Sequence, residues 1–390
     1  MQKPASSAEC KRQALLQTKL IADTKPIMNH VTLLLPLFIS LMVAGCSKKT
    51  LPPQTVSDNT PIQTAPAVRR PASLGIIGDT ANINVPVSGG VVLMGGSTDV
   101  DAAFRWMIAR GGGGDVVVIR ASGTDAYNPY INKLGTVNSV ETLKIDSREL
   151  AENDTVAAII RNAEMLFIAG GDQSNYMRFW KGTKTEHAIN YLLNEKKAPV
   201  GGTSAGCAIL GGFYYSGEGG SAVSATALQD PYRSEVTLYQ NDFLQPPYLQ
   251  QVITDQHYLQ RNREGRSVVF LGRILKDWGV AANAIAVDER TAVCIDKDGT
   301  AKVMGLSSAT RPFSYAYFIT TSEKRPPEQI AAGKPLHWNQ GQQALVVYEI
   351  AASEDGNGQF PVASFDMNKA TGGKKYWWWV ENGVLNKKAQ

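Results

Sequence analysis

Short apolar runs alternate with amphipathic stretches along the middle of this sequence, beginning near Pro86. The runs predict buried strands at residues 90–95, 115–120, 141–145, 165–169 and 198–200. The stretches between them predict helices at residues 99–110, 154–161, 176–180 and 185–194. Because such an alternation is typical of a sheet covered on both faces, we expect a three-layer α/β fold with a mostly parallel sheet. Ligands bind such sheets at the carboxyl ends of the strands, where Gly95-Gly96, Gly170-Gly171 and Gly201-Gly202 fall.

The last third of the sequence is richer in strands. Apolar runs predict strands at residues 284–287, 292–295, 301–304 and 344–348. The turn sequence Asp296-Lys-Asp-Gly299 joins two of them and indicates antiparallel pairing. Beyond residue 350, the aromatic run Trp377-Trp-Trp379 favours a packed strand over a sugar- or partner-binding surface. We therefore divide this part into a main domain, residues 87–350, and a strand-rich extension, residues 351–390.

The N-terminal region has the pattern of an export signal. Residues 31–45 are apolar but short for a membrane span, and basic residues precede them. The sequence Leu41-Met-Val-Ala-Gly-Cys46 resembles a bacterial lipoprotein signal, which implies cleavage and lipidation at Cys46. We expect residues 1–46 to be this signal and residues 47–86, rich in Pro, Thr, Gln and Ala, to be a disordered tether. A lipid anchor predicts a cell-envelope location, at the outer membrane; a transmembrane anchor or an ordinary signal peptide is the alternative.

Charge argues against nucleic-acid binding, and the cysteine pattern indicates buried thiols. The formal net charge is +4, and residues 1–46 account for +3 of it with five basic residues against two acidic ones. The remainder is nearly neutral, which argues against a nucleic-acid partner. Cys207 and Cys294 lie in apolar surroundings and are expected to be buried free thiols. The sequence has no metal-ligand spacing.

The sequence Gly202-Thr-Ser204-Ala-Gly206 has the G-x-S-x-G spacing of a nucleophile elbow. Glycines flank the serine because a sharp strand-to-helix turn leaves no room for side chains. Ser204 is then a candidate nucleophile, and the backbone N–H of Ala205 at the helix start is a candidate oxyanion donor. The same pattern also occurs in phosphate-binding turns and in tightly packed turns. Assigning Ser204 as a nucleophile therefore also requires a general base elsewhere in the sequence.

His257 is the best candidate for a general base. Of the four histidines, it alone lies in a polar, charged cluster, which runs from Thr254 to Arg266. Glu289 follows a predicted buried strand and is the candidate acid that orients His257, with Asp288 as the fallback. The alternative is that His257 begins a helix and that Glu289 forms a surface ion pair.

Three arginines follow His257 within nine residues, at positions 261, 263 and 266. Guanidinium groups bind carboxylates in bidentate geometry. Arg261, Arg263 and Arg266 therefore predict a substrate with a free carboxylate, such as an aspartyl residue. A solvated basic face is the alternative.

Together these motifs resemble the cyanophycinase, or peptidase S51, family of serine peptidases. The resemblance rests on four motifs, which occur here in the family's order: Gly170-Gly-Asp-Gln173, Gly202-Thr-Ser-Ala-Gly206, Asp255-Gln-His257 with the arginines, and Asp288-Glu289. It implies a flavodoxin-like fold related to class I glutamine amidotransferases, and a reaction that needs neither a metal nor a cofactor. It also implies Ser204 as nucleophile, His257 as base and Glu289 as acid. Gln173, Asp255 and Gln256 would lie beside the substrate, and Gly96 would supply the second oxyanion donor.

The resemblance implies hydrolysis of aspartyl bonds, including the β-linked Asp-Arg bond of cyanophycin-like polymers, and suggests a homodimer. Residues 213–253 are longer than expected and contain aromatic residues and prolines, which leaves the substrate open. Two other functions compete with this reading. One is an esterase of the α/β-hydrolase type, although that fold usually places the acid before the histidine. The other is a surface lipoprotein that binds a peptide or polymer without catalysis.

Overall fold

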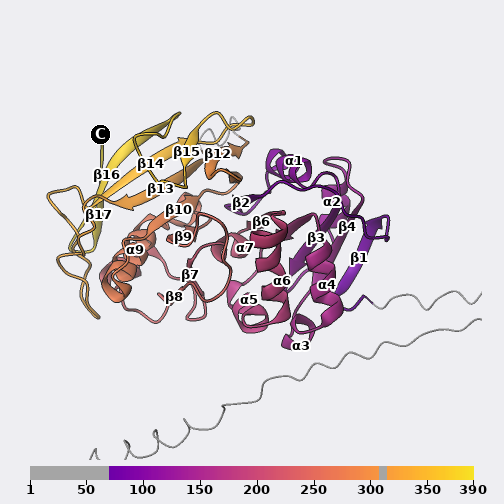
Figure 1. Cartoon of the computed structure of the whole chain (residues 1–390). Coiled ribbons are helices and arrows are strands. Elements are labelled where there is room, and N and C mark those ends of the chain that lie inside the picture. The colour runs from indigo at the N-terminus through magenta and orange to yellow at the C-terminus, as the bar shows by residue number, and fades with distance from the viewer. Residues whose placement is uncertain (1–69, 307–313) are drawn as a thin grey trace, which may run out of the picture. The chain divides into compact units, whose positions relative to one another are not determined.

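The computed structural model describes residues 70–306 and 314–390, which form two β-sheets with flanking helices (Figure 1). The predicted signal (1–46), the predicted lipidation site Cys46 and the tether up to residue 69 lie outside the described residues. Within the described ranges, no helix has the length and apolar character needed to cross a membrane.

The first sheet has nine strands and contains most of the parallel pairing. In spatial order its strands are β1 (Ser73–Gly78), β4 (Ser139–Lys144), β3 (Asp115–Arg120), β5 (Met165–Ile168), β6 (Pro199–Thr203), β2 (Gly90–Met94), β11 (Thr291–Asp296), β12 (Thr300–Gly305) and β15 (Gln359–Pro361). The five strands from β4 to β2 are parallel to one another. β1 on one side and β11, β12 and β15 on the other pair antiparallel.

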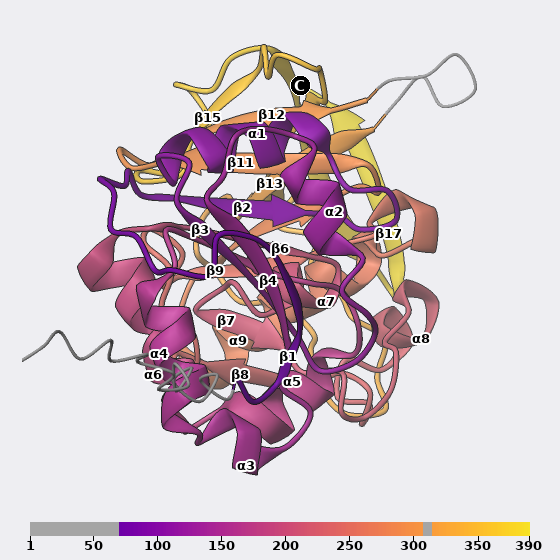
Figure 2. The same cartoon turned by 90° about the vertical axis from the view of Figure 1, so that its right-hand side faces the viewer.

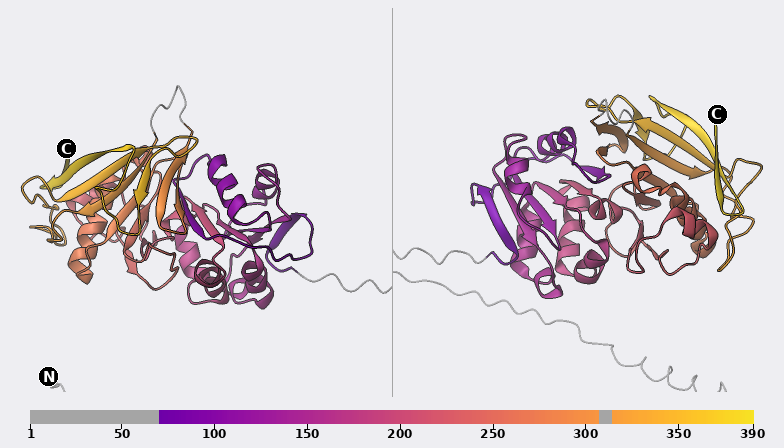
Figure 3. Two further views of the ribbon diagram at one scale, coloured as in Figure 1. Left: turned by 45° about the horizontal axis from the view of Figure 1, so that its top comes forward. Right: turned by 180° about the vertical axis from the view of Figure 1, so that it is seen from behind.

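The second sheet has eight strands and is mainly antiparallel. In spatial order its strands are β17 (Val384–Ala389), β16 (Gly373–Glu381), β14 (Leu345–Ala351), β13 (Tyr315–Thr321), β10 (Asn283–Val287), β9 (Val252–Asp255), β7 (Phe213–Tyr215) and β8 (Leu238–Gln240). β9 pairs parallel with both β10 and β7. Both views of Figure 3 show the orange and yellow strands of this sheet gathered on one side of the described part.

Helices cover both faces of the first sheet, and α9 covers one face of the second. The helices are α1 (Asp101–Arg110), α2 (Tyr127–Asn132), α3 (Arg148–Ala151), α4 (Asp154–Asn162), α5 (Gln173–Trp180), α6 (Lys184–Tyr191), α7 (Ala205–Ala208), α8 (Ser224–Gln229) and α9 (Glu264–Trp278), with a π-helical turn at Leu192–Lys196 and a 3-10 turn at Leu259–Arg261. Figure 2 shows α1 and α2 on one side of the first sheet and α4, α5 and α6 on the other.

The apolar runs form continuous strands because both of their faces are buried. In β3, Val116 and Val118 pack toward α1 and α2, whereas Val117 and Ile119 pack toward α4 and its neighbours. Side chains of a strand alternate between faces, so a strand covered on both sides needs an unbroken apolar run. The expected α/β class with a strand-rich C-terminal part is confirmed, with its strands divided between two sheets.

The folded region begins earlier than the predicted tether allows. The tether was expected to extend to residue 86, but β1 lies inside it and pairs antiparallel with β4. Arg70, just before β1, also forms an ion pair with the buried carboxylate of Glu141 on β4. The two glycines of Ser-Leu-Gly-Ile-Ile-Gly weaken its strand signal, and the pairing that stabilises it is visible only in the sheet.

Residues 351–390 are part of the fold and not a separate extension. β15 pairs with β12 in the first sheet, and β16 pairs with β14 in the second. Trp378 and Trp379 are buried, as a packed strand requires, while Trp377 is half-buried. The described residues, 70–306 and 314–390, belong to one compact unit, so the predicted boundary at residue 350 separates no domains.

Candidate active site

Ser204 lies at a sharp turn between β6 and α7. Its backbone has φ of +52° and ψ of −114°, a conformation that residues other than glycine rarely adopt. The turn places Ser204 at the carboxyl end of the parallel strands, and α7 contacts β6, β2 and β9. A strained serine at this edge of a sheet matches the geometry of a nucleophile elbow.

Close backbone packing explains the glycines on either side of the serine. A Cβ atom added to Gly202 would lie 2.5 Å from the carbonyl carbon and oxygen of Gly206. One added to Gly206 would lie 2.2 Å from the carbonyl oxygen of Ile168 on β5. Both distances are shorter than any normal contact. The G-x-S-x-G spacing is therefore required by the backbone of this turn.

Ser204, His257 and Glu289 form a continuous hydrogen-bonded chain. The Ser204 Oγ atom lies 2.8 Å from Nε2 of His257, and Nδ1 of His257 lies 2.7 Å from Oε1 of Glu289. His257 follows β9 and Glu289 follows β10, so two neighbouring strands carry the base and the acid. A carboxylate only accepts hydrogen bonds, which places the imidazole proton on Nδ1 and leaves Nε2 free to accept from Ser204.

The surroundings of His257 favour its neutral form. The residue is 5% exposed, and burial lowers its pKa. The hydrogen bond to Glu289 opposes this effect and raises the pKa, whereas the charges of Arg261 and Arg263 lower it further. The net shift is downward, so His257 is unprotonated and able to accept a proton at neutral pH.

Two glycine loops border the Ser204–His257 pair: the first is Gly95-Gly96, after β2, and the second is Gly170-Gly171, after β5. A Cβ atom added to Gly96, which has φ of +100°, would lie 2.5 Å from the His257 ring and 3.1 Å from Cβ of Ser204. The N–H of His257 donates to the Gly95 carbonyl at 2.8 Å, which fixes the histidine loop against β2. A Cβ atom on Gly170 would lie 3.4 Å from Cβ of Ser204. The predicted glycine pairs therefore do meet at the serine.

Gln173 lies just beyond the second glycine loop, as the first residue of α5. Asp172 caps this helix by accepting the N–H of Ser174. A Cβ atom added to Gly217 would lie 2.7 Å from the Gln173 side-chain nitrogen, so the segment after β7 packs against this amide. Residues 213–253 thus contribute to the surroundings of the site.

Asp255 and Arg266 bind each other and not a ligand. Each is 1% exposed. Arg266 Nε donates to Asp255 Oδ2 at 3.0 Å, and Nη2 donates to the other carboxylate oxygen. Ser267 also donates to this carboxylate, at 2.8 Å. Burial opposes ionisation of Asp255, but Arg266 outweighs it and lowers the pKa of the carboxyl below its usual value.

Arg263 is likewise hydrogen-bonded within the protein, to Gln256. It donates to both the backbone carbonyl and the side-chain oxygen of Gln256, and it is 6% exposed. Burial and the nearby Arg266 charge lower the pKa of Arg263 to about 10. Only Arg261 of the three arginines is exposed. The prediction of three carboxylate-binding arginines therefore needs correction, because two of the three stabilise the loop that carries His257.

Comparison with known sequences settles the family. The model of Peptidase family S51 matches residues 87–303, more than half of the chain. The chain belongs to this family.

Its similarity to individual S51 proteins is modest. It is 28% identical over 204 residues to a cyanophycinase from Synechococcus elongatus, a match that covers 51% of this chain and 58% of that protein. It is 32% identical over 175 residues to a cyanophycinase from Nostoc, covering 44% of this chain and 52% of that protein. A crystal structure of a peptidase from an acI-B1 Actinobacterium matches with a TM-score of 0.42 at 16% identity, covering 64% of this chain and 96% of that one.

Asp288 is a supporting residue of the candidate site whose contacts the sequence did not reveal. It is fully buried, and its carboxylate accepts the N–H groups of Leu259 and Tyr315, each at 2.9 Å. Burial raises its pKa to about 7, although these two hydrogen bonds oppose the shift. Asp288 links the His257 loop to β13, whereas Glu289 makes the contact with His257.

The two cysteines of the described S51 region are buried free thiols, as expected. Cys207 lies in α7 behind the Ser204 turn, and burial raises the pKa of its thiol. A buried thiol with a raised pKa is a poor nucleophile. In residues 70–306 and 314–390, no group of three or more His, Cys, Asp or Glu side chains is arranged to hold a metal ion.

Proposed function

We propose that this chain is a serine peptidase in which Ser204 is the nucleophile, His257 the general base and Glu289 the acid that orients His257. One observation carries the proposal: the chain of contacts from Ser204 Oγ through His257 to Glu289, at 2.8 and 2.7 Å. Family membership supports the reaction class, and the strained elbow supports the choice of nucleophile.

Acylation begins when Nε2 of His257 takes the proton of Ser204 Oγ as the oxygen attacks the substrate carbonyl. The carbonyl oxygen becomes an oxyanion, which the backbone N–H groups of Ala205 and Gly96 stabilise. Ala205 is the first residue of α7, so its N–H group has no acceptor within the helix and is available to the oxyanion. His257 then donates its proton to the leaving amine, and the peptide bond breaks.

Deacylation repeats these steps with water as the nucleophile. His257 takes a proton from water, and the hydroxide attacks the ester that joins the substrate to Ser204. The proton returns to Ser204 as the ester breaks, which releases the acid product. Glu289 stabilises the imidazolium that forms in both halves of the reaction.

The proposed substrate bears a carboxylate near the bond that is cleaved. Arg261 is exposed, and its charge is close enough to His257 to lower the pKa of that histidine. An arginine in this position suits an aspartyl residue, and Gln173, just beyond Gly170-Gly171, adds a half-buried amide. The relatives named cyanophycinases favour a β-linked Asp-Arg bond as one substrate.

Hydrolysis of defined substrates tests this proposal. Purified protein is incubated with cyanophycin and with a panel of α- and β-aspartyl dipeptides, and the products are identified by mass. We expect cleavage on the carboxyl side of aspartyl residues, and no cleavage by Ser204→Ala. The exposed Ser364→Ala is the matched control and should be fully active. Full activity in Ser204→Ala would rule out the mechanism, and cleavage of simple acyl esters alone would favour an esterase.

We also propose that the protein is exported and anchored through a lipid on Cys46. The signal-like sequence that ends at Cys46 motivates this proposal. In cells that carry out lipoprotein processing, labelled palmitate should enter the wild-type chain and Cys10→Ser, but not Cys46→Ser. Equal labelling of Cys46→Ser would exclude the anchor. Light scattering of the purified protein tests the homodimer that the family resemblance suggests.

A further inference from the structure

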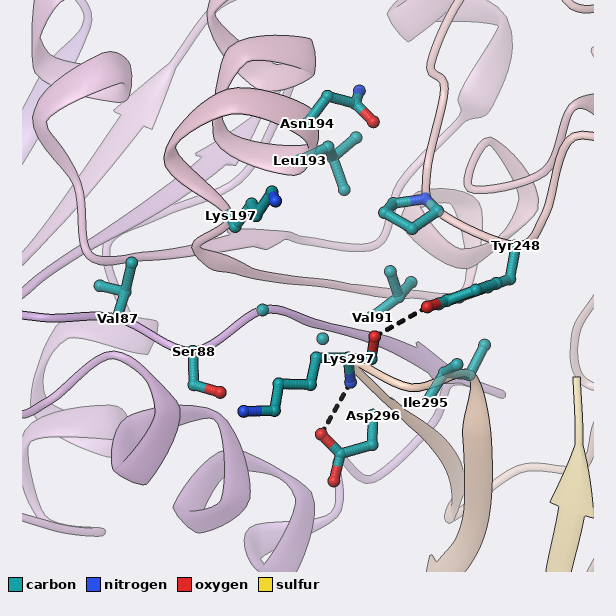
Figure 4. A pocket seen from close by; sticks show the side chains of 13 residues that line it. Val87, Ser88, Val91, Leu193, Asn194, Lys197, Tyr248, Ile295, Asp296 and Lys297 are labelled. Atoms are coloured by element: carbon teal, nitrogen blue, oxygen red, sulfur yellow. Dashed lines mark hydrogen bonds between the residues drawn. The ribbon is translucent and has the colours of Figure 1, made fainter. Parts of the chain in front are cut away.

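A cleft of about 460 Å³ lies at the end of the first sheet opposite Ser204 (Figure 4). Gly90 lines the cleft at the start of β2, whereas Gly95, just after β2, accepts a hydrogen bond from His257. β11 runs the other way, from Thr291 near Glu289 to Asp296 in the cleft. The cleft and the candidate active site therefore lie at opposite ends of the same strands.

Apolar side chains form much of the cleft lining. They belong to Val87, Val91, Leu193, Pro247 and Ile295. Tyr248 adds an aromatic wall, to the right in Figure 4, and its hydroxyl donates to the backbone carbonyl of Lys297 at 2.8 Å. This bond holds the ring in place although Tyr248 is 38% exposed. Small-molecule sites have this character, with apolar walls and volumes of roughly 300–1,000 Å³.

Two lysines give the cleft a positive charge. Lys197 and Lys297 both line it, above and below in Figure 4. The acidic residue of the lining, Asp296, is already paired with Arg110 at 2.5 Å. Neither Lys197 nor Lys297 has an ion-pair partner among the residues that the structure describes, unlike Lys196, which binds Glu164. The lining therefore leaves two ammonium groups beside an apolar surface.

We propose that this cleft is a second binding site, separate from the Ser204 site, for a small carboxylate with an apolar body. The carboxylate lies between Lys197 and Lys297, and the apolar body contacts Leu193, Pro247 and the Tyr248 ring. A medium-chain fatty acid and the C-terminal end of a peptide with an apolar last residue share this chemistry. Binding in this cleft does not require hydrolysis, so its test is independent of the proposed function.

Calorimetric titration of the full chain tests the site. The probes are butanoate, hexanoate and octanoate for a fatty acid, acetyl-leucine for a peptide end, and octanol as the uncharged counterpart. We expect affinity to rise about fourfold for each added methylene, because each one buries further apolar surface. Replacing both lysines, as Lys197→Gln with Lys297→Gln, should weaken carboxylate binding about tenfold and leave octanol binding unchanged.

Two control variants separate binding in this cleft from a general effect of lost lysine charge and from binding at the Ser204 site. Lys133→Gln removes an exposed lysine elsewhere and should bind carboxylates like the wild type. Ser204→Ala should also bind them like the wild type, whether or not the protein hydrolyses peptides. Binding of octanoate alone would assign the fatty acid, and binding of acetyl-leucine would assign a peptide end. Absence of saturable binding at millimolar concentrations, or equal binding by the double lysine variant, would overturn the proposal.

Discussion

Two residues at the candidate site have backbone conformations that L-residues avoid. Ser204 has φ of +52° and His257 has φ of +47°. Each such residue costs on the order of 1–3 kcal/mol, which the surrounding structure must offset. The glycines around Ser204 revealed the first case in the sequence. Nothing around His257 revealed the second, since its backbone is held by the carbonyl of Gly95, 162 positions earlier in the chain.

Substitution of Gly96 should block catalysis without unfolding the protein. In Gly96→Ala the new methyl group would lie 2.5 Å from the His257 ring, so the ring must move away from Ser204. We expect kcat to fall about a hundredfold or more, because small misplacements of reacting groups have effects of this size. Gly182→Ala is the control: it has a similar positive φ of +70° but open space around the new methyl group. Equal kcat in the two variants would contradict the placement of Gly96.

The pH dependence of hydrolysis should reflect His257. The histidine acts as a base only when neutral, so kcat/KM should fall as the pH drops through its lowered pKa and stay level at neutral pH. Glu289→Gln should reduce kcat about 10³- to 10⁴-fold. It should also move the acid limb to lower pH, because the Glu289 contact raises the His257 pKa. The exposed Glu354→Gln should keep the wild-type profile, and an acid limb unmoved by Glu289→Gln would count against the assignment.

At the scale of elements, the segment from the end of β9 to the first turn of α9 contains arginines with two different roles. The sequence predicted that all three arginines bind a substrate carboxylate, because their spacing does not show which side chains face inward. Arg266 lies on the buried side of α9 and joins this helix to Asp255 at the end of β9, whereas Arg261 lies in the exposed turn before the helix. The charged residues of this segment could be predicted to matter, but their separate roles depend on the partner each one meets.

The arginines give a direct test of this division. Arg266→Ala leaves the Asp255 carboxylate buried without its partner, and we expect a loss of about 3–5 kcal/mol in the free energy of unfolding. Arg261→Ala should change the free energy of unfolding by less than about 0.5 kcal/mol but raise KM for aspartyl substrates. Denaturant titration and steady-state kinetics measure the two effects. A stable Arg266→Ala variant with raised KM would reverse the assignment.

At the scale of the whole molecule, the sequence predicts the parallel strands better than their assembly. Buried strands such as β3 and β5 are unbroken apolar runs, and they lie where the sequence predicts them. The division into two sheets was not predicted, because it depends on which strands pair across long stretches of sequence. β13 was missed as well, although it pairs with both β10 and β14 in the centre of the second sheet.

Truncation tests whether the C-terminal strands belong to the core. A chain that ends at residue 372 lacks β16 and β17, and with them the buried side chains of Trp378, Trp379 and Val380. Full burial of each large apolar side chain contributes about 1.5–3 kcal/mol, and domains are stable by only about 5–15 kcal/mol. We expect this chain to lose cooperative thermal unfolding, and a chain that begins at residue 66 to melt like the wild type. Cooperative melting of the C-terminal truncation near the wild-type temperature would contradict this role.

The central claim is that Ser204 is the nucleophile, and reaction with a fluorophosphonate tests it most directly. Intact-mass and peptide analysis of the treated protein should show one added group, located on Ser204, in the wild type and in Ser364→Ala. Ser204→Ala should take up none, and His257→Ala should react far more slowly because the base is missing. Labelling at another residue, or undiminished labelling of Ser204→Ala, would contradict the account.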